Sequence, residues 1–505
     1  MALTQPWSIG LAQACTPHHL LLAAAGVALG TLSGLLDGLA PVALIAVALP
    51  LLYGEPPVDT LIVVAALLAA APSGTAIASV LARPPRAGGA ESAALDGHSL
   101  ARQGRAAAAL VGAGLACAVG GALALAVVAL AVAALAPMAA PWEPPAMVAL
   151  LLLALTASVV LSGGSLIKAL AMALTGWLMA QGSPAAYPAL VRGLGAATPD
   201  LSTPWGLVLA AVGVWGLGDA VVRLARPDEP RDVWMRGSRR RWPRWRDLRP
   251  VWAAMLRASA LGTLLGGLPD GGVARAARAA YALERRWPAL AGERMFGRGN
   301  LRGVAAAPSA DGAAARMAFV PLLAWGVPVN TATALVLGTV VLDGQPLQAV
   351  LAGANASIGW TLLGSMAVVA AILPVLCLPL AAGWARVLAV PRRWVLVAVV
   401  LAACWGVYLV HRDPMDLYMV GGFAVLGYVW HLLHCDPAPW LVGFVLGPRI
   451  EAQARAALVA SGGDWTSLWT HPAAALLLAC AVGLVLAVLT LPSLAAWRRV
   501  GTDED

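Results

Sequence analysis

The chain has 505 residues, of which 60% are hydrophobic and only 11% are charged, and its formal net charge is +8. An average soluble domain is about one quarter charged, so this composition excludes a soluble globular protein and leaves no room for a large soluble domain. The basic residues lie in loops between apolar segments, a pattern typical of topology signals near anionic lipid rather than of a nucleic-acid surface. We therefore expect a polytopic protein embedded in a lipid bilayer.

The apolar segments follow one another along the whole chain. In order, they lie at 20–36, 41–53, 59–82, 106–137, 146–161, 165–181, 205–222, 252–268, 317–342, 347–387, 394–410, 415–434, 438–447 and 473–496. A span needs roughly 20 apolar residues, so these segments predict about 10–14 spans. They lack the alternation of strands, and only helices or closed barrels satisfy the backbone in lipid. The predicted fold is an all-α membrane helical bundle.

One basic loop divides the chain. Residues 223–250, which include "RGSRRRWPRWRDLRP", contain ten arginines. Arginine-rich loops stay on the cytoplasmic side, so we expect this loop to be cytoplasmic. It separates an N-terminal membrane repeat, 1–222, from a C-terminal membrane repeat, 251–505.

Two similar motifs support that division. "LGTLSGLLDGLAP" (29–41) and "LGTLLGGLPDGG" (261–272) share the same pattern near the start of each half. The second follows the basic loop, whereas the first follows a stretch with no Lys or Arg, so the two motifs are entered from opposite sides. This indicates inverted repeats, whose broken or re-entrant helices form the substrate site in many transporters. Chance similarity of Leu/Gly-rich membrane sequence is the alternative.

The second motif contains its own helix breaker. Pro269 lacks a backbone donor and disfavours helix at Leu268, and the neighbouring glycines permit turns. Unpaired backbone groups are tolerated in a membrane only where protein or water satisfies them. We expect breaks at 34–41, 72–75, 266–272 and 326–331, arranged around a binding site.

Two acidic residues fall inside the motif breaks. Carboxylates within a membrane are costly and usually functional, so Asp37 and Gly38, with Asp270 and Gly271, are predicted to bind a coupling Na⁺ or to relay a proton. The alternative is that both breaks lie near an interface, where the carboxylates meet water.

Hydroxyl and amide side chains beside the other two breaks suit a substrate carboxylate, because the start of a helix is electropositive. The predicted substrate-binding residues are Ser73, Gly74, Thr75, Pro328, Asn330, Thr331 and Thr333. The alternative is hydrogen bonding between packed helices.

Three charged residues form a second tier of candidates. Lys168 could pair with a substrate carboxylate or with Asp219, but we favour an interfacial, snorkelling lysine. Asp311 and Arg316 could form a local pair on one helix.

No catalytic constellation, phosphate loop or dinucleotide motif is present, so we expect no enzyme activity and no cofactor apart from Na⁺ as a possible coupling ion. His431, His434 and Cys435 in "HLLHCD" lack further ligands for a metal site. The six cysteines are scattered without paired spacing, which predicts free thiols.

Several motifs together resemble the large permease subunit of the tripartite tricarboxylate transporters. Besides the two motifs above, similar segments are "ALDGHSLARQGRAAAAL" (94–110), "LSGGSLIKALAMAL" (161–174), "YALERR" (281–286), "AFVPLLAWGVPVNTATALVLG" (318–338) and "DPAPWLVGFVLGPRIEAQARAALVASGGD" (436–464). The resemblance implies a secondary carrier for small organic carboxylates in a bacterial inner membrane. It also implies two partners, a periplasmic solute-binding protein and a small four-helix membrane subunit, and an ion gradient as the driving force.

The chain departs from the family pattern at several sites. The usual Gly-Pro-Glu-Ala-Ala-Asn-Asn-Ala stretch corresponds to residues 306–313, which lack the Glu and both Asn. Pro-Gly is replaced by Asp37-Gly38 in the first break and by Pro269-Asp270 in the second. A membrane binding or sensing subunit that has kept the fold but does not transport is therefore the alternative function.

Overall fold

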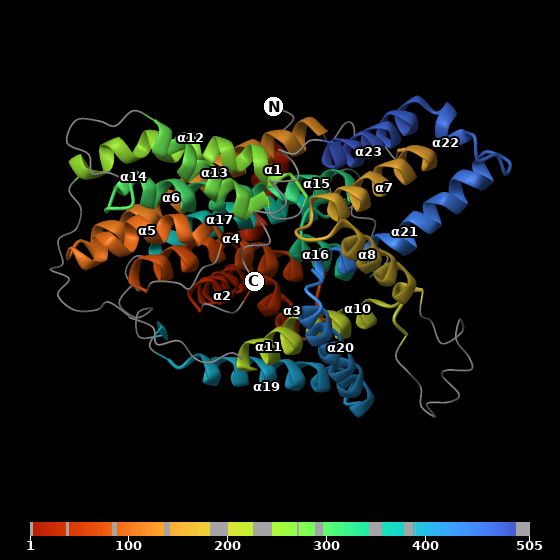
Figure 1. Cartoon of the computed structure of the whole chain (residues 1–505), viewed down its shortest axis with the longest axis horizontal. Coiled ribbons are helices and arrows are strands. Elements are labelled where there is room, and N and C mark those ends of the chain that lie inside the picture. The colour runs from red at the N-terminus through yellow and green to blue at the C-terminus, as the bar shows by residue number, and fades with distance from the viewer. Residues whose placement is uncertain are drawn as a thin grey trace.

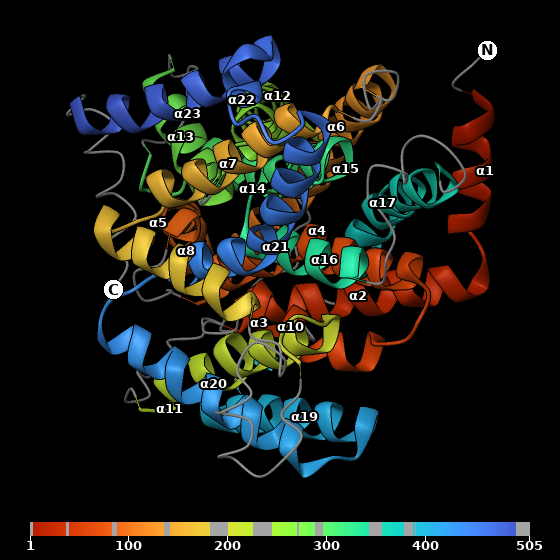
Figure 2. The same cartoon turned by 90° about the vertical axis from the view of Figure 1, so that its right-hand side faces the viewer.

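Figures 1 and 2 show a computed structural model of the chain. It describes residues 4–36, 40–82, 88–135, 142–181, 200–225, 245–269, 272–287, 296–342, 356–377, 387–388 and 390–490. Helices make up the regular structure of these residues, and no strand occurs among them. The predicted all-α fold is confirmed.

Helices follow one another along the described parts of the chain. In chain order they are α1 (Thr4–Ala14), α2 (Pro17–Leu35), α3 (Pro41–Leu52), α4 (Pro57–Leu81), α5 (Gly88–Arg102), α6 (Ala106–Leu135), α7 (Pro144–Leu161), α8 (Leu166–Ala180), α10 (Pro204–Ala211), the π-helix η2 (Val212–Gly218), α11 (Asp219–Ala225), α12 (Trp245–Gly266), α13 (Gly272–Arg286), α14 (Leu301–Met317), α15 (Phe319–Trp325), α16 (Thr331–Leu342), α17 (Ala356–Cys377), α19 (Arg392–His411), α20 (Pro414–Leu432), α21 (Ala438–Ala460), α22 (Ser467–Thr470) and α23 (Pro472–Thr490).

Length and composition make this a multi-pass membrane protein. Within the described residues, 8 helices are long and apolar enough to cross a bilayer, and three shorter apolar helices accompany them. One of the eight is the continuous run Pro204–Ala225, which joins α10, η2 and α11. The most enclosed is α4, whose apolar window is 89% buried by the other helices. Helix α4 therefore forms the middle of the bundle.

Proline sets the start of many of these helices. It occupies one of the first two positions of α2, α3, α4, α7, α10, α20 and α21. The first amides of a helix have no intrahelical partner, so the missing N–H of proline costs nothing there, and its fixed φ matches the helix. These starts can be read directly from the sequence.

The helices pack in three groups (Figures 1 and 2). The first contains α2, α4, α5, α6, α12, α13, α14 and α17, with α1 packed on α17. The second contains α3, α10, η2, α11, α19 and α20, and the third contains α7, α8, α21, α22 and α23. Helix α16 contacts α3, α4, α10 and α21 and thus links all three groups.

The two motif helices pack in the same way in both halves. Helix α2 packs on α4 through Gly30 and Gly34, where a Cβ would overlap the backbone of α4. Helix α12 packs on α14 through Gly262 and Gly266, where a Cβ would overlap the backbone of α14. Small residues allow such close approach of membrane helices. The recurrence supports the predicted repeat, whose inverted orientation and boundaries stay a prediction.

The predicted break at 72–75 is wrong, because α4 is helical from Pro57 to Leu81. The small residues of this stretch serve close packing instead of a turn. A Cβ on Gly74 would overlap the Thr31 carbonyl of α2, and a Cβ on Gly34 would overlap the Ala71 carbonyl of α4. Pro72 is accommodated inside the helix.

Helices do end at the other three predicted breaks. Helix α2 ends at Leu35 and α3 begins at Pro41, and α12 ends at Gly266 before α13 begins at Gly272. Between α15 and α16 the chain leaves the helix at 326–330. The basic loop falls largely outside the described residues, which resume at 245.

Candidate functional site

Four polar side chains lie near one another where α4, α6 and α14 pack together. Helix α4 contributes Ser73, α6 contributes Cys117, and α14 contributes Asp311 and Arg316. The Cys117 thiol faces the Ser73 hydroxyl and lies within electrostatic range of both charged groups of α14. We call these four residues the central cluster. Three of them, all except Cys117, were singled out from the sequence.

Glycines on α6 and α14 create the room for this cluster. A Cβ on Gly120 would overlap the backbone of Ser309, and a Cβ on Gly312 would stand 2.6 Å from the Cys117 carbonyl oxygen. A Cβ on Gly121 would overlap the guanidinium of Arg316. The two helices therefore touch along their backbones, and the Arg316 side chain occupies the space left by a missing side chain.

Arg316 is fully buried and largely unpaired. Its relative exposure is 0%. Nη1 donates to the Gly312 carbonyl oxygen at 2.8 Å, whereas Nε and Nη2 have no hydrogen-bond partner. An arginine stays protonated in proteins, and a buried charge without a counter-ion costs several kcal/mol. A guanidinium with two free donor groups matches the paired oxygens of a carboxylate. Two donor groups of Arg316 are therefore left without an acceptor among the described residues.

Ser73 and Arg316 occupy corresponding places in the two helix pairs. Ser73 lies two residues after Ala71, and Ala71 packs against Gly34 of the first motif. Arg316 lies two residues after Ala314, and Ala314 packs against Gly266, which occupies the same position in the second motif. The Ser73 oxygen is buried and, apart from the facing thiol, has no partner. A polar group from each half thus faces the middle of the bundle.

Asp311 does not pair with Arg316, so the expected local pair on one helix is wrong. Five residues correspond to roughly 140° around a helix, which points the two side chains in different directions. The Asp311 carboxyl oxygen Oδ1 is buried and has no hydrogen-bond partner. The residue as a whole keeps some accessible surface.

The polar residues after Pro328 form a helix cap. The Asn330 carbonyl oxygen Oδ1 accepts the Thr333 amide at 2.8 Å, and the Thr333 hydroxyl oxygen accepts the amides of Val329 at 3.1 Å and Asn330 at 3.0 Å. Gly326 ends α15 in the left-handed conformation, with φ 64°. These polar atoms satisfy the backbone at the start of α16, which is what a capping residue does, so the predicted role of Pro328, Asn330, Thr331 and Thr333 in substrate binding stays a prediction.

Thr75 and Gly74 likewise have structural contacts. The Thr75 hydroxyl donates to the Ala71 carbonyl of its own helix at 3.1 Å, and Gly74 packs against α2. Among the three predicted residues of this stretch, Ser73 is the one that the structure places in the central cluster.

The predicted ion-coupling residues Asp37, Gly38, Asp270 and Gly271 lie outside the described residues. Their role stays a prediction.

Lys168 contacts neither Asp219 nor a buried carboxylate. Its Nζ donates to the Leu433 carbonyl oxygen at 2.7 Å, at the C-terminal end of α20. A cation at the end of a helix is favoured by the helix dipole. Asp219 pairs instead with Arg223, at 2.8 Å.

Asp96 of "ALDGHSLARQGR" organises the approach to α14. It is 0% exposed, and its carboxylate accepts the Tyr281 hydroxyl at 2.9 Å and the amides of Gly297, Gly299 and Asn300 at 2.8, 2.9 and 2.8 Å. Burial, and then the neighbouring Asp96 carboxylate, raise the pKa of Tyr281 above its ordinary value. The carboxylate fixes the loop that leads into α14.

Glu284 of "YALERR" contacts the same end of α14. It accepts hydrogen bonds from Arg257 of α12, at 2.7 and 2.9 Å, and from Arg302 of α14, at 2.7 and 3.1 Å. Burial alone would raise its pKa, but the hydrogen bonds from Arg257 and Arg302 outweigh burial and lower it. The carboxylates of these two family-like motifs are thus structural.

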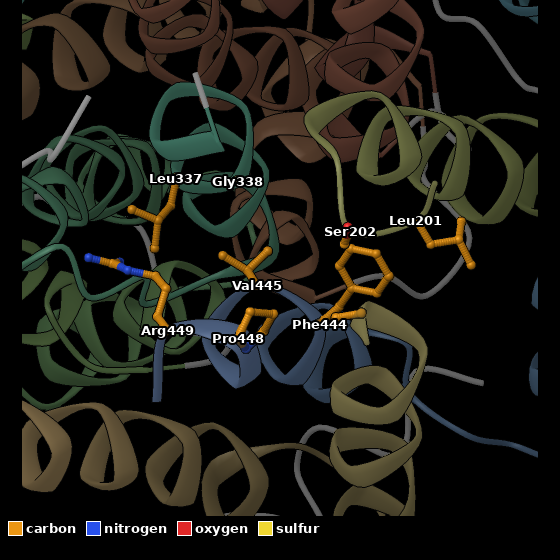
Figure 3. A pocket seen from close by; sticks show the side chains of 9 residues that line it. Leu201, Ser202, Leu337, Gly338, Phe444, Val445, Pro448 and Arg449 are labelled. Atoms are coloured by element: carbon orange, nitrogen blue, oxygen red, sulfur yellow. The ribbon is translucent and has the colours of Figure 1, made fainter. Parts of the chain in front are cut away.

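A pocket lies between α8, α16 and α21 (Figure 3). Its lining is mostly apolar, and Arg449 is the charged residue on its wall. Figure 3 shows the Arg449 side chain extending away from the Leu201 side of the pocket. Arg449 Nη1 donates to the Gly326 carbonyl oxygen at 2.9 Å, so this guanidinium satisfies the backbone at the break between α15 and α16.

Cys117 and Gly121 were missed by sequence analysis because each lies in an apolar run like many others. Among the described residues, no group of three His, Cys, Asp or Glu side chains could hold a metal ion. The described cysteines, Cys15, Cys117, Cys404, Cys435 and Cys480, are free thiols.

The fold and the central cluster define a multi-pass helical membrane protein with charged groups at its core. The chain belongs to the tripartite tricarboxylate transporter TctA family, whose profile matches residues 20–442. This family is one of transporters rather than enzymes, and it implies a tripartite system with other subunits.

Two relatives come from Agrobacterium vitis. "Uncharacterized 52.8 kDa protein in TAR-I ttuC' 3'region" is 34% identical over 507 residues, which cover 100% of both chains. "Uncharacterized protein in TAR-II ttuC' 3'region" is 38% identical over 246 residues, which cover 48% of this chain and 100% of the relative. No solved structure matches the chain.

Proposed function

We propose that the chain is the permease of a secondary active transporter that imports a small organic di- or tricarboxylate across a bacterial inner membrane. The observation that carries this proposal is Arg316, a buried guanidinium with two unpartnered nitrogen atoms in the middle of the helical bundle. An unpaired charge is costly there, so a charged residue in such a place usually has a function. A substrate carboxylate supplies the missing counter-charge and accepts both free donors.

The remaining parts of the proposal extend family membership. A periplasmic solute-binding protein delivers the substrate, a small four-helix membrane subunit accompanies the permease, and a Na⁺ or proton gradient drives import. The basic loop 223–250 faces the cytoplasm, in keeping with its arginines. Both remaining subunits are partners by analogy with the family.

Alternating access requires the central cluster to open toward each side in turn. Helix α14 continues into α15 and then into the non-helical segment 326–330, which separates it from α16. A segment whose backbone is not held in a helix can absorb a change of dihedral angles. We place the hinge of the transport motion there.

Cys117 provides a direct test, because its thiol lies inside the cluster. The experiment uses membrane vesicles from cells that express a variant in which the other five cysteines are replaced by serine. Labelling by a small anionic methanethiosulfonate is measured with and without citrate and succinate as tricarboxylate and dicarboxylate probes. We expect labelling that at least one probe slows.

Two arginine variants, one inside and one outside the central cluster, show whether protection of Cys117 depends on the charge of Arg316. A bidentate hydrogen bond to a charged group contributes about 1.5–3 kcal/mol, so Arg316→Met weakens protection by about 10- to 150-fold. Arg223→Gln, which removes a partly exposed arginine of α11, leaves protection unchanged. The proposal is wrong if Cys117 is never labelled, or if protection is the same in Arg316→Met.

Uptake of the same probes into vesicles that also contain the companion subunits distinguishes transport from sensing. Accumulation under an ion gradient supports a permease. Protection of Cys117 without any flux under any gradient indicates the alternative, a binding or sensing subunit with the transporter fold, and overturns the transport proposal.

A further inference from the structure

Asp311 is the second charged group of the central cluster, and the anion site does not explain it. Its Oδ1 is buried without a hydrogen-bond partner, and no ion pair joins it to another described residue. An isolated carboxylate is strongly disfavoured away from water, whereas the protonated form is not. Asp311 therefore needs either a cation or a proton whenever the site is closed.

Among the described residues, Asp311 has few of the oxygen ligands that a metal cation requires, and the Ser73 hydroxyl is the one other side-chain oxygen of the central cluster. Sodium sites in transporters use unwound carbonyls at broken helices, but α14 is helical throughout from Leu301 to Met317, so the carbonyls near Asp311 belong to a continuous helix. The adjacent residues Ala310 and Gly312 carry no oxygen in their side chains. Residues 306–313 also lack the Glu and both Asn of the family pattern. A proton requires none of these ligands.

Among the residues that the structure describes, no ionisable group on the packed helices forms a hydrogen bond or an ion pair with Asp311 Oδ1. Helix α6 presents the Cys117 thiol and α4 presents the Ser73 hydroxyl. The ionisable groups whose hydrogen bonds tie α5, α12 and α13 to the start of α14 are Asp96, Tyr281, Arg257 and Glu284. The buried Arg275 of α13 donates to the Leu161 carbonyl oxygen at 2.9 Å. The distance along α14 from Arg302 to Asp311 is about 13 Å. Arg316, on the same helix, is the remaining charge.

Charge balance links Asp311 to the anion on Arg316. Arg316 compensates one substrate carboxylate, so an occluded site that holds a di- or tricarboxylate is closest to neutral if Asp311 is protonated. An empty site has no net charge only if Asp311 is ionised. The other two combinations leave one more unit of net charge in a region from which water is excluded, and they are disfavoured. The loaded carrier thus moves with a proton, and the empty carrier returns without one.

We propose that Asp311 carries the coupling proton and that import is a symport of the carboxylate with a proton. This inference rests on the proposed function. In the outward-open state Asp311 takes a proton from water as the substrate carboxylate binds Arg316. In the inward-open state the O–H bond of Asp311 breaks, the proton passes to water, and the substrate leaves. No other atom is exchanged.

The test compares transport driven by a pH gradient with exchange at equilibrium. In vesicles that contain the chain with its companion subunits, we expect citrate or succinate uptake to rise about tenfold or more with an inward proton gradient and to carry measurable protons, in line with the size of typical site couplings. Asp311→Asn abolishes both the proton flux and the response to the gradient. It keeps the exchange of internal for external substrate, because exchange does not require the empty carrier to return.

Asp416→Asn is the matched control, since Asp416 is a carboxylate that is 3% exposed but hydrogen-bonded to Trp205 and His411. It should keep proton-driven uptake. A Na⁺ gradient that drives wild-type uptake without proton flux, or unchanged proton coupling in Asp311→Asn, overturns the inference and leaves the proposed function intact.

An infrared titration of the purified full chain tests Asp311 without substrate. We expect a carboxylic-acid C=O band that titrates with pH in the wild-type protein and in Asp416→Asn but is missing from Asp311→Asn. The same band in all three proteins excludes Asp311 as the titrating group. Because this measurement requires no flux, it separates failure of the inference from failure of transport.

Discussion

Two adjacent glycines of α6 allow the position of Arg316 to be tested without changing Arg316. A Cβ on Gly120 would meet the backbone of Ser309, which cannot yield without moving α14. A Cβ on Gly121 would meet the end of the Arg316 side chain, with Nη2 at 2.7 Å. The same substitution, Gly to Ala, thus has a rigid obstacle at one position and a flexible one at the next.

The expected magnitudes follow from these obstacles. Overpacking against a backbone costs about 1–3 kcal/mol, and replacing a helical glycine by alanine returns up to about 1 kcal/mol, so Gly120→Ala should lose about 1–2 kcal/mol of stability. In Gly121→Ala the guanidinium swings aside and loses its hydrogen bond to Gly312, which contributes about 1 kcal/mol. That loss and the helix-propensity gain nearly cancel, so stability stays close to that of the wild type.

The assays are thermal unfolding in detergent and citrate or succinate protection of Cys117. Since membrane proteins often unfold irreversibly, the melting temperatures serve to rank the variants at one scan rate. Gly121→Ala should melt with the wild-type protein but lose protection as Arg316→Met does, and Gly120→Ala should melt earlier. Unchanged protection in Gly121→Ala, or wild-type melting of Gly120→Ala, would show that our account of this contact is wrong.

Two further predictions concern the network at the start of α14. Asp96→Ala leaves four donors without an acceptor, and each donor that water cannot reach costs about 1–3 kcal/mol. This substitution should therefore lower the melting temperature far more than Tyr281→Phe, which removes a single donor. Equal shifts in the melting temperature would refute this prediction. Because hydrogen bonds from Arg257 and Arg302 lower the pKa of Glu284 below its ordinary 4.5, the stability it contributes is fully present above that value and is lost as the pH falls through the folded-state pKa. Melting temperatures measured from about pH 6 to about pH 3 should therefore fall more steeply in the wild type than in Glu284→Gln. Parallel curves would contradict the assignment.

The sequence by itself determined the features that depend on short stretches of chain. Composition and the length of the apolar runs indicated an all-α membrane bundle, because lipid allows few other structures. Prolines marked helix starts, and Gly326 with Pro328 marked the end of α15, because both residues restrict their own backbone and that of their neighbours. Arg316 and Asp311 were noticed because charges are rare in such segments.

Only the tertiary structure decided what the small residues do and which polar groups meet. The stretch from Ser73 to Thr75 was predicted to break a helix, and instead it packs α4 against α2. Lipid is as apolar as the inside of a bundle, so a membrane helix does not show in its sequence which face is buried. That Arg316 faces Cys117 in the space beside Gly121 depends on contacts between residues nearly two hundred positions apart, and no local pattern records them.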